Sequence, residues 1–326
     1  MEPPYSNLDP FFQKGFGHLV KWRVVETVMG RRRADRHSPF ATPRIFNEGT
    51  PLNTPEPHLC WIGHSSFLLR LSALCVVTDP VWSAGVGGGV NRNVPPGVQI
   101  PRLPPIDVIT ISHAHYDHLD VPSVRDLVRH TWSLRGTKRG TTILVPKGVK
   151  RYLKGPEFED VVELEWWESH TRKGPRGELH FTLVPQQHWS MRMPWDRNRT
   201  LWGGWVMKSS EGTAYHAGDT GYFSHFGEIA RRCGPIDWAM LPIGGYDPQW
   251  MMQAQHMNPE EAGRAFLDLG AQNLVAMHWG TFQLTDEPLS EPPKRLLAWW
   301  DAAGPGTAAR DRLWTLKIGE TRMLKG

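Results

Sequence analysis

The stretch that decides the fold is 106–120, IDVITISHAHYDHLD. Its first seven residues are mostly apolar and β-branched and follow two prolines, which is typical of a short buried strand. The residues directly after it include three imidazoles and one carboxylate, from His113, His115, Asp117 and His118. Imidazole nitrogen and carboxylate oxygen suit zinc and related divalent ions. We therefore predict a metal-binding loop at the C-terminal end of a strand.

Three further segments extend this arrangement, which argues against a solvated loop with chance histidines. His188 and His278 each follow an apolar, strand-like run, and Asp219 lies in the turn Ala-Gly-Asp-Thr-Gly at 217–221. The glycines permit a tight turn in which a carboxylate can approach a metal closely. These ligands outnumber those that one tetrahedral site can use, so the sequence favours two neighbouring ions.

In this order, the four pieces resemble the motifs of the metallo-β-lactamase superfamily and span roughly 58–282. The chain is most similar to the branch that contains the N-acylphosphatidylethanolamine-hydrolysing phospholipase D and its bacterial relatives. The segments that carry this likeness are WIGHSS (61–66), TDP (78–80), QHW (187–189), GDTGY (218–222), LPIGGY (241–246), NPEEA (258–262) and HWGTF (278–282). The resemblance implies an α/β fold, the αββα sandwich.

The resemblance also implies two zinc ions, each with its own ligands. The first set is His113, His115 and His188, the second is Asp117, His118 and His278, and Asp219 bridges the two ions. Two divalent cations roughly 4 Å apart can share a water, lower its pKa and hold it as hydroxide for attack. The residues leave open whether Asp117 is a ligand alone or also orients this water and accepts its proton.

Two residues near the ligands are expected to support them. Asp79 follows the apolar run 74–78, and its place in the family motif implies a hydrogen bond that fixes the tautomer of a ligand histidine. The alternative is a turn-forming aspartate before Pro80. His64 follows the strand-like run 59–62 and is predicted either to support a ligand in the same way or to be structural.

Substrate contacts are expected from three residues. His256 precedes a helix start with Asn258 as the N-cap, and the resemblance implies that it binds or protonates a substrate phosphate, against an alternative of capping or packing. Tyr246 belongs to a family motif. Arg192 lies in the polar loop after His188, where a guanidinium could bind a phosphate or carboxylate, and a solvated loop is the alternative.

The composition indicates a large domain with a sizeable core. The chain has 326 residues with 40% hydrophobic content, enough for one large domain or a domain with an extension. Three cysteines argue against a disulfide framework and favour a reducing compartment. We see neither a signal peptide nor a run near the ~18 apolar residues of a membrane span, so we expect a cytoplasmic protein. The net charge of +4 is too small to argue for nucleic acid.

We expect an N-terminal extension, 1–55, before a catalytic domain, 56–326. The segment 11–29 mixes apolar and basic residues and is followed by three arginines, which predicts a basic amphipathic helix. Such a helix could contact a membrane surface peripherally, or pack on the domain with its arginines in solvent. The proline-containing stretch 50–57 is the expected linker, and 85–97 is a predicted flexible loop beside the active site. A homodimer is compatible with the sequence.

The sequence therefore predicts a zinc-dependent hydrolase of a small-molecule or lipid substrate, with a phosphodiesterase of the phospholipase D type as the favoured interpretation. The likeness around 241–246 and 256–262 carries this preference. A lactonase of the L-ascorbate-6-phosphate lactonase kind looks similar in its metal motifs and is the first alternative. A non-catalytic lipid- or partner-binding relative is the second, although the complete ligand set argues against it.

Overall fold

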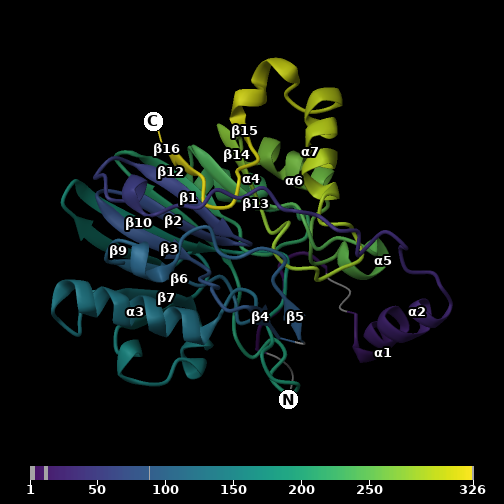
Figure 1. Ribbon diagram of the computed structural model, residues 1–326, viewed down its shortest axis with the longest axis horizontal. Helices are drawn as coiled ribbons and strands as arrows, with labels where there is room; N and C mark the ends of the chain where they lie inside the picture. The colour runs from purple at the N-terminus through teal and green to yellow at the C-terminus, as the bar shows by residue number, and fades with distance from the viewer. Residues whose placement is uncertain (1–3, 11–13, 88, 325–326) are drawn as a thin grey trace.

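The computed structural model describes residues 4–10, 14–87 and 89–324, and Figure 1 shows its layers. Two seven-stranded sheets lie face to face. The first contains, in spatial order, β16 (Thr321–Met323), β1 (His58–Gly63), β2 (Ser66–Leu71), β3 (Leu74–Thr78), β6 (Val108–Thr110), β7 (Thr142–Pro146) and β8 (Val161–Leu164). The second contains β15 (Leu313–Trp314), β14 (Asn273–Met277), β13 (Trp238–Pro242), β12 (Gly212–His216), β11 (Gly204–Ser209), β10 (Gly177–Val184) and β9 (Ser169–Gly174).

Helices cover the outer face of each sheet. The helix α3 (Val121–Arg135) packs on the first sheet, and its apolar side chains share one core cluster with those of β1, β3 and β6. The helices α4 (Phe226–Cys233), α6 (Pro259–Asp268) and α7 (Glu291–Ala302) cover the second sheet. Short 3-10 turns lie at Thr50–Leu52, Ile100–Arg102, Val149–Tyr152, Pro156–Phe158 and Thr307–Arg312. The layers run helix, sheet, sheet, helix, which confirms the predicted αββα sandwich.

Alternating side chains explain why the first sheet is buried on both faces. In β2, Phe67 and Leu69 belong to the core between the sheets, whereas Leu68 belongs to the core beneath α3. In β1, Trp61 and Ile62 divide in the same way. Successive side chains of a strand point to opposite faces, so a strand covered on both sides is apolar at nearly every position.

The elements predicted around the ligands are present. The strands β6, β10 and β14 occupy the three apolar runs that precede ligand residues. The helix predicted after His256 is α6. Its N-cap Asn258 accepts a hydrogen bond from the Glu261 N–H at 2.8 Å, and the Glu261 carboxylate accepts one from the Asn258 N–H at 3.0 Å. The predicted helix start is therefore confirmed as a capping box.

The segment 85–97, predicted as a loop, contains short strands. It contains a two-stranded antiparallel ribbon, β4 (Gly85–Val86) and β5 (Val90–Asn91), in which Val86 pairs with Val90. Gly88, which lies between the two strands in sequence, is outside the described residues. The predicted loop therefore contains one short strand pair, and its flexibility stays a prediction.

The N-terminal helical segment consists of α1 (Phe16–Val20), a π-helical turn at Lys21–Val25 and α2 (Glu26–Val28). These elements occupy most of the helix predicted over 11–29, of which residues 11–13 lie outside the described residues. Among the helices that the structure describes, none has the length and apolar character needed to cross a membrane.

The inner side of this segment packs on the rest of the chain. Trp22 is buried against the methionines of α5 (Gln249–Met252). Its indole N–H donates to the Asp286 carboxylate at 2.8 Å, and Arg32 pairs with the same carboxylate. The predicted packing of the helix on the domain therefore holds for the side that carries Trp22.

The stretch that was expected to lead into a linker is also packed. Leu52 is fully buried. Asn47 donates to the Gly319 carbonyl at 2.9 Å, and Thr42 donates to the Gly280 carbonyl at 2.6 Å. Burial and hydrogen bonds therefore join residues 42–52 to the sandwich.

Candidate metal centre

Seven candidate ligands meet at one edge of the sandwich. The loop after β6 carries four of them, and one residue follows each of β10, β12 and β14. The strands β12, β13 and β14 are parallel, and β10 points the same way as β12 because β11 is antiparallel to both. Carboxyl ends of strands that point the same way lie at the same edge of a sheet, where ligands commonly bind in α/β folds. The loops of both sheets therefore build the site together.

The first cluster joins His113, His115, His188 and Asp219. His115 Nδ1 lies 2.8 Å from His113 Nε2 and 3.3 Å from His188 Nε2. Asp219 Oδ2 lies 3.9 Å from His113 Nε2 and 3.8 Å from His188 Nε2. Ligand atoms around a tetrahedral zinc, each about 2.1 Å from the ion, are about 3.4 Å apart. The cluster therefore has the size of a four-ligand metal site.

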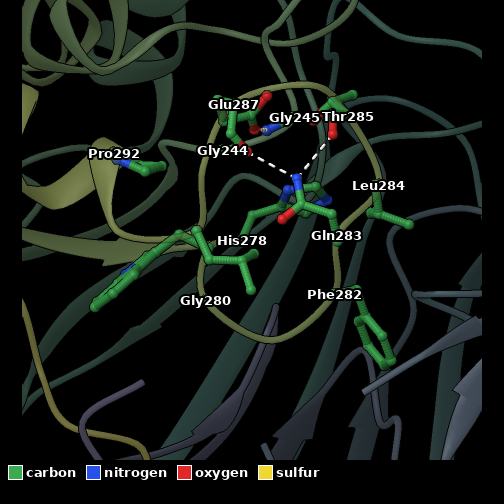
Figure 2. A pocket seen from close by; sticks show the side chains of 12 residues that line it. Gly244, Gly245, His278, Gly280, Phe282, Gln283, Leu284, Thr285, Glu287 and Pro292 are labelled. Carbon is green, nitrogen blue, oxygen red and sulfur yellow. Dashed lines mark hydrogen bonds between the residues drawn. The ribbon is translucent and has the colours of Figure 1, made fainter. Parts of the chain in front are cut away.

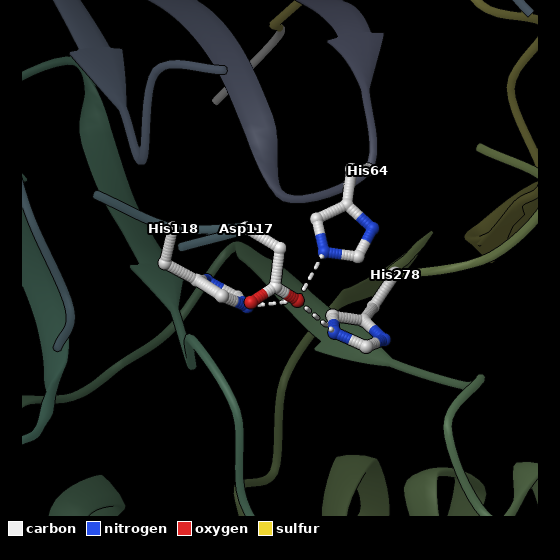
Figure 3. A group of neighbouring side chains, drawn as sticks. All are labelled: His64, Asp117, His118 and His278. Carbon is white, nitrogen blue, oxygen red and sulfur yellow. Dashed lines mark hydrogen bonds and ion pairs between the residues drawn. The ribbon is translucent and has the colours of Figure 1, made fainter. Parts of the chain in front are cut away.

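The second cluster joins His64, Asp117, His118 and His278, as Figure 3 shows. Asp117 Oδ2 lies 3.5 Å from His118 Nε2 and 3.7 Å from His278 Nε2. Asp219 faces this cluster too, with Oδ2 at 3.1 Å from His118 Nε2 and Oδ1 at 3.1 Å from His278 Nε2. Its carboxylate therefore stands between the two clusters.

Hydrogen bonds outside the clusters fix the orientation of three ligand rings. Asp79 accepts from His118 Nδ1 at 2.8 Å and from the Ser112 hydroxyl at 2.6 Å. The Ser112 hydroxyl accepts from His113 Nδ1 at 2.9 Å, and His188 Nδ1 donates to a backbone carbonyl at 2.9 Å. In each ring Nδ1 carries the proton, so Nε2 is the atom left for a metal.

The first cluster holds its imidazoles in the neutral form. Burial lowers the pKa of His115 to about 4 and that of His188 to about 3. Burial likewise holds the pKa of His113 well below its usual range. A neutral imidazole is the form that binds a metal, so these three residues need to release no proton at pH 7 to do so.

The second cluster holds positive charge between two carboxylates. Burial alone would lower the pKa of His278, but Asp219 and Asp117 outweigh it and raise that pKa to about 9. The same carboxylates raise the pKa of His118 well above its usual range against the effect of burial. A divalent cation would satisfy both carboxylates and displace these protons, because metal binding to such groups releases protons.

Unpaired atoms at the centre fit a cation. His118 Nε2, His278 Nε2 and Asp219 Oδ1 are buried and lie at ion-pair distance from one another or from Asp219 Oδ2, yet none of the three makes a hydrogen bond of acceptable geometry among the described residues. Buried polar atoms without partners are rare and point to an ion, a ligand or a functional role. The donor set, imidazole nitrogen with carboxylate oxygen, suits divalent zinc and its neighbours. The residues present therefore fit a metal pair.

Three residues with a left-handed backbone surround the second cluster. His64, Asp79 and His278 have φ values of 55°, 36° and 62°, in the left-handed region. Each such conformation of a residue other than glycine costs of order 1–3 kcal/mol and persists only where the surroundings enforce it. These backbone conformations therefore lower the free energy of unfolding at residues in or beside the second cluster.

A glycine of the segment 241–246 lets two histidines approach each other. Gly245 has φ 88°, and a Cβ at this position would lie 3.2 Å from His256 Nδ1 and 3.3 Å from His278 Cε1. Its N–H donates to the buried carboxylate of Glu287 at 2.6 Å. A side chain here would therefore push apart residues on both sides of the site.

The loop after β14 is folded around a small cavity, shown in Figure 2. The Gln283 side chain donates to the carbonyls of Thr285 and Glu287 at 2.8 and 2.7 Å. The cavity is lined by Gly244 and Gly245, by His278 and by residues of this loop. The internal hydrogen bonds keep the loop, and with it the surroundings of His278, in one conformation.

Comparison with known proteins assigns this arrangement to a family. A family model described as a β-lactamase superfamily domain matches residues 75–279, more than half of the chain. The chain belongs to the metallo-β-lactamase superfamily. The matched range of this metal-dependent metallo-β-lactamase-fold hydrolase includes all seven candidate ligands.

Two curated relatives are similar in sequence to this protein over most of its length. An uncharacterised protein of Mycobacterium tuberculosis is 39% identical over 306 residues, which are 90% of this chain and 77% of the relative. The N-acyl-phosphatidylethanolamine-hydrolyzing phospholipase D 1 of Caenorhabditis elegans is 33% identical over 253 residues, 74% of this chain and 69% of the relative.

A solved structure shares the metallo-β-lactamase fold. The isothiocyanate hydrolase from Delia radicum gut bacteria superposes with a TM-score of 0.61 over 82% of this chain and 100% of that protein. The two sequences are 17% identical, so the likeness concerns the fold.

The structure places His64, Asp79 and His256 beside the candidate ligands. His64 Nε2 donates to Asp117 Oδ2 at 3.1 Å, since burial lowers the pKa of His64 to about 3 and Asp117 is a carboxylate. His256 Nδ1 lies 3.9 Å from Asp219 Oδ2. The His256 side chain is 13% exposed, and burial lowers its pKa to about 3. It therefore borders both clusters as a neutral imidazole.

The structure does not bring Tyr246 and Arg192 to the cluster as substrate contacts. Tyr246 is buried, and its hydroxyl donates to Glu291 at 2.7 Å. Arg192 donates to the Leu119 carbonyl at 2.8 Å, and its guanidinium lies over the Tyr116 ring at 4.3 Å. Both side chains already have partners, which favours structural roles over the predicted substrate contacts.

Three supporting groups escaped the sequence analysis. Ser112 joins Asp79 to His113, the Gln255 carbonyl accepts from His188, and Asn7 bonds the His188 backbone. A serine directly before the histidine cluster was the only signal in the sequence for these contacts. A carbonyl acceptor and a partner from the other end of the chain leave no pattern in the residue order.

Proposed function

We propose that this hydrolase holds two zinc ions and cleaves the phosphodiester bond of an N-acylated phosphatidylethanolamine. The observation that carries the proposal is the similarity to the phospholipase D of Caenorhabditis elegans, which covers 74% of the chain. The geometry supports it, because Asp219 stands between two clusters of the size that metal ions require.

The chemistry of the reaction follows from the residues around the centre. When bound, two divalent cations lower the pKa of a shared water and polarise the phosphoryl oxygen. Asp117 is the more exposed of the central carboxylates, with a side chain that is 15% exposed against 2% for Asp219. The bond from His64 orients Asp117, which can accept a proton from the attacking water.

Bond changes are those of a hydrolysis. The water oxygen forms a bond to phosphorus, and the bond from phosphorus to the ethanolamine oxygen breaks. The products are phosphatidic acid and an N-acylethanolamine, and the departing oxygen takes up one proton. His256 lies at the border of both clusters and can donate a hydrogen bond to the phosphate.

The decisive experiment measures initial hydrolysis rates of the zinc-loaded protein on an N-acylated phosphatidylethanolamine and on a panel of lactones. We expect release of phosphatidic acid and no lactone opening. Asp117→Ala should lower the rate at least about a hundredfold, because it removes both a ligand and the candidate base. Asp126→Ala, at an exposed position of α3, is the matched control and should retain the rate.

Lactone opening without phosphodiester turnover would place the protein with the lactonases. Stoichiometric zinc with no turnover on either class would favour a binding protein. A phosphodiesterase rate that Asp117→Ala leaves unchanged would show that Asp117 is neither a required ligand nor the base.

Because the proposed substrate is a lipid, the same proposal includes binding of the protein to a lipid surface. The N-terminal helical segment exposes an apolar side, with Val24 at 54%, Val28 at 82% and Met29 at 58% exposure. Residues 14–36 contain seven Lys or Arg against two acidic residues, and of these Arg32 and Arg33 are paired with Asp286 and Glu291. Apolar side chains beside excess positive charge fit an anionic phospholipid surface.

Vesicle co-sedimentation tests this contact. The double variant Val24→Asp, Val28→Asp should reduce partitioning onto anionic vesicles at least about tenfold, because burial of each valine contributes about 1.5 kcal/mol and 1.4 kcal/mol is a factor of ten. Leu267→Asp, at a half-exposed leucine of α6, is the control. Equal partitioning of both variants would remove the helical segment from the proposal.

A further inference from the structure

The amide of Asn7 pairs with the backbone of a candidate metal ligand. Asn7 Nδ2 donates to the His188 carbonyl at 2.8 Å, and Asn7 Oδ1 accepts from the His188 N–H at 3.0 Å. The two residues are 181 positions apart in the chain. A side-chain amide thus makes the pair of hydrogen bonds that a neighbouring strand would make.

The segment around Asn7 is fixed at a second point. Asp9 accepts from the N–H and the hydroxyl of Ser224, both at 2.8 Å, and lies 3.3 Å from His225 Nε2. Burial alone would raise the pKa of Asp9, but the bonds from Ser224 and His225 outweigh it and lower that pKa. The carboxylate is therefore charged near neutral pH, and it anchors the chain two residues beyond Asn7.

The backbone of His188 depends on this contact. His188 is 1% exposed and lies beyond the end of β10, so the sheet provides no partner there. Among the described residues, Asn7 is the partner recorded for both its N–H and its carbonyl. A buried backbone group without a partner costs about 1–3 kcal/mol, so without Asn7 the loop would shift to find water or another partner.

The direction of the His188 ring follows from its backbone. Its Nδ1 donates to the Gln255 carbonyl at 2.9 Å, and its Nε2 faces His115 Nδ1 at 3.3 Å. A ring held at Nδ1 and at its own backbone has one orientation, in which Nε2 points into the first cluster. Partners of this kind commonly change metal affinity by 10–100-fold when removed.

We propose that Asn7 is a positioning residue for the metal bound by the first cluster. This inference rests on the proposed binding of zinc. It makes the N-terminal segment a part of the metal site. The second cluster receives no contact from Asn7 among the interactions of the described residues. The effect of Asn7 should therefore be confined to one of two ions.

The test is a zinc titration of the metal-free full chain by calorimetry, with cobalt absorption spectra as a second readout. In Asn7→Ala we expect one of the two ions to bind about 10–100-fold more weakly, with the other unchanged. Asn7→Asp keeps the acceptor but turns an oxygen toward the His188 carbonyl, so its loss should be at least as large. Asn273→Ala, which removes an amide bonded to the Asp237 carbonyl at 3.0 Å, is the matched control.

The outcomes separate this inference from the proposed function. Two ions bound by Asn7→Ala with wild-type affinity would overturn the role of Asn7 and leave the proposed function intact. Equal weakening of both ions, together with a lower unfolding midpoint of the metal-free protein, would also overturn it in favour of a general structural role. A wild-type chain that binds no zinc would overturn the proposed function and this inference with it.

Discussion

Asp219→Asn is expected to cost the protein both metal ions and at least about a thousandfold in hydrolysis rate. Asn has nearly the same shape, so the change removes charge more than volume. Oδ2 of Asp219 faces His113, His188 and His118, and Oδ1 faces His278. Loss of this carboxylate weakens both clusters at once. Bound metals supply several kcal/mol of charge stabilisation, and each 1.4 kcal/mol is a factor of ten in rate.

The measurement is metal content per chain after dialysis, together with the hydrolysis rate. Asp126→Asn on the exposed face of α3 is the control, since it changes the same side chain far from the centre. Two tightly bound ions in Asp219→Asn would show that the carboxylate does not bridge them.

His256→Ala should have the second largest effect, a fall of about 10²-fold in kcat with the metal content unchanged. Removal of a positioned hydrogen-bonding or proton-transferring group typically costs 10²–10⁴-fold. His256 lies 3.9 Å from Asp219 Oδ2 and borders the site without belonging to either ligand set of the resemblance. Burial lowers the pKa of this imidazole to about 3, so at pH 7 it is neutral and acts as a hydrogen-bond donor.

His256→Gln separates hydrogen bonding from proton transfer. Glutamine retains a neutral N–H donor, so this variant should keep more activity than His256→Ala if the residue binds the phosphate. Equal loss in both variants would instead indicate proton transfer. His37→Ala, at an exposed histidine, serves as the control, and reduced zinc content in His256→Ala would identify His256 as a ligand.

Local patterns explain why so much of the site was predictable. The strands β6, β10 and β14 lie in runs rich in apolar residues, and a candidate ligand histidine follows each strand within four residues. Such runs mark both the strand and the edge where it ends. When the C-terminal ends of three such strands lie at the same edge of a sandwich, the ligands that follow them lie close together. The αββα order itself came from the resemblance, since alternation alone does not specify which sheet faces which.

Side-chain direction was not predictable in the same way. Tyr246 and Arg192 stand next to motif residues, yet Tyr246 turns to Glu291 and Arg192 turns to backbone carbonyls. Helices and strands have a fixed period that sets the direction of each side chain, but a loop has none. Proximity to a motif in sequence therefore does not tell whether a loop side chain points toward the site or away from it. The contact of Asn7 was not predicted for a different reason: its partner His188 is 181 residues away in the chain.

The first cluster draws ligands from both sheets: His113 follows β6 of one sheet, and His188 follows β10 of the other. An ion held between them is also a crosslink through the sandwich. The three cysteines of the chain are free, so this is a tie that a chelator can remove and added metal can restore. At a metal concentration a thousandfold above Kd, the tie adds about 4 kcal/mol to the free energy of unfolding. Metal supply would then govern the lifetime of the folded protein as well as its rate of substrate hydrolysis.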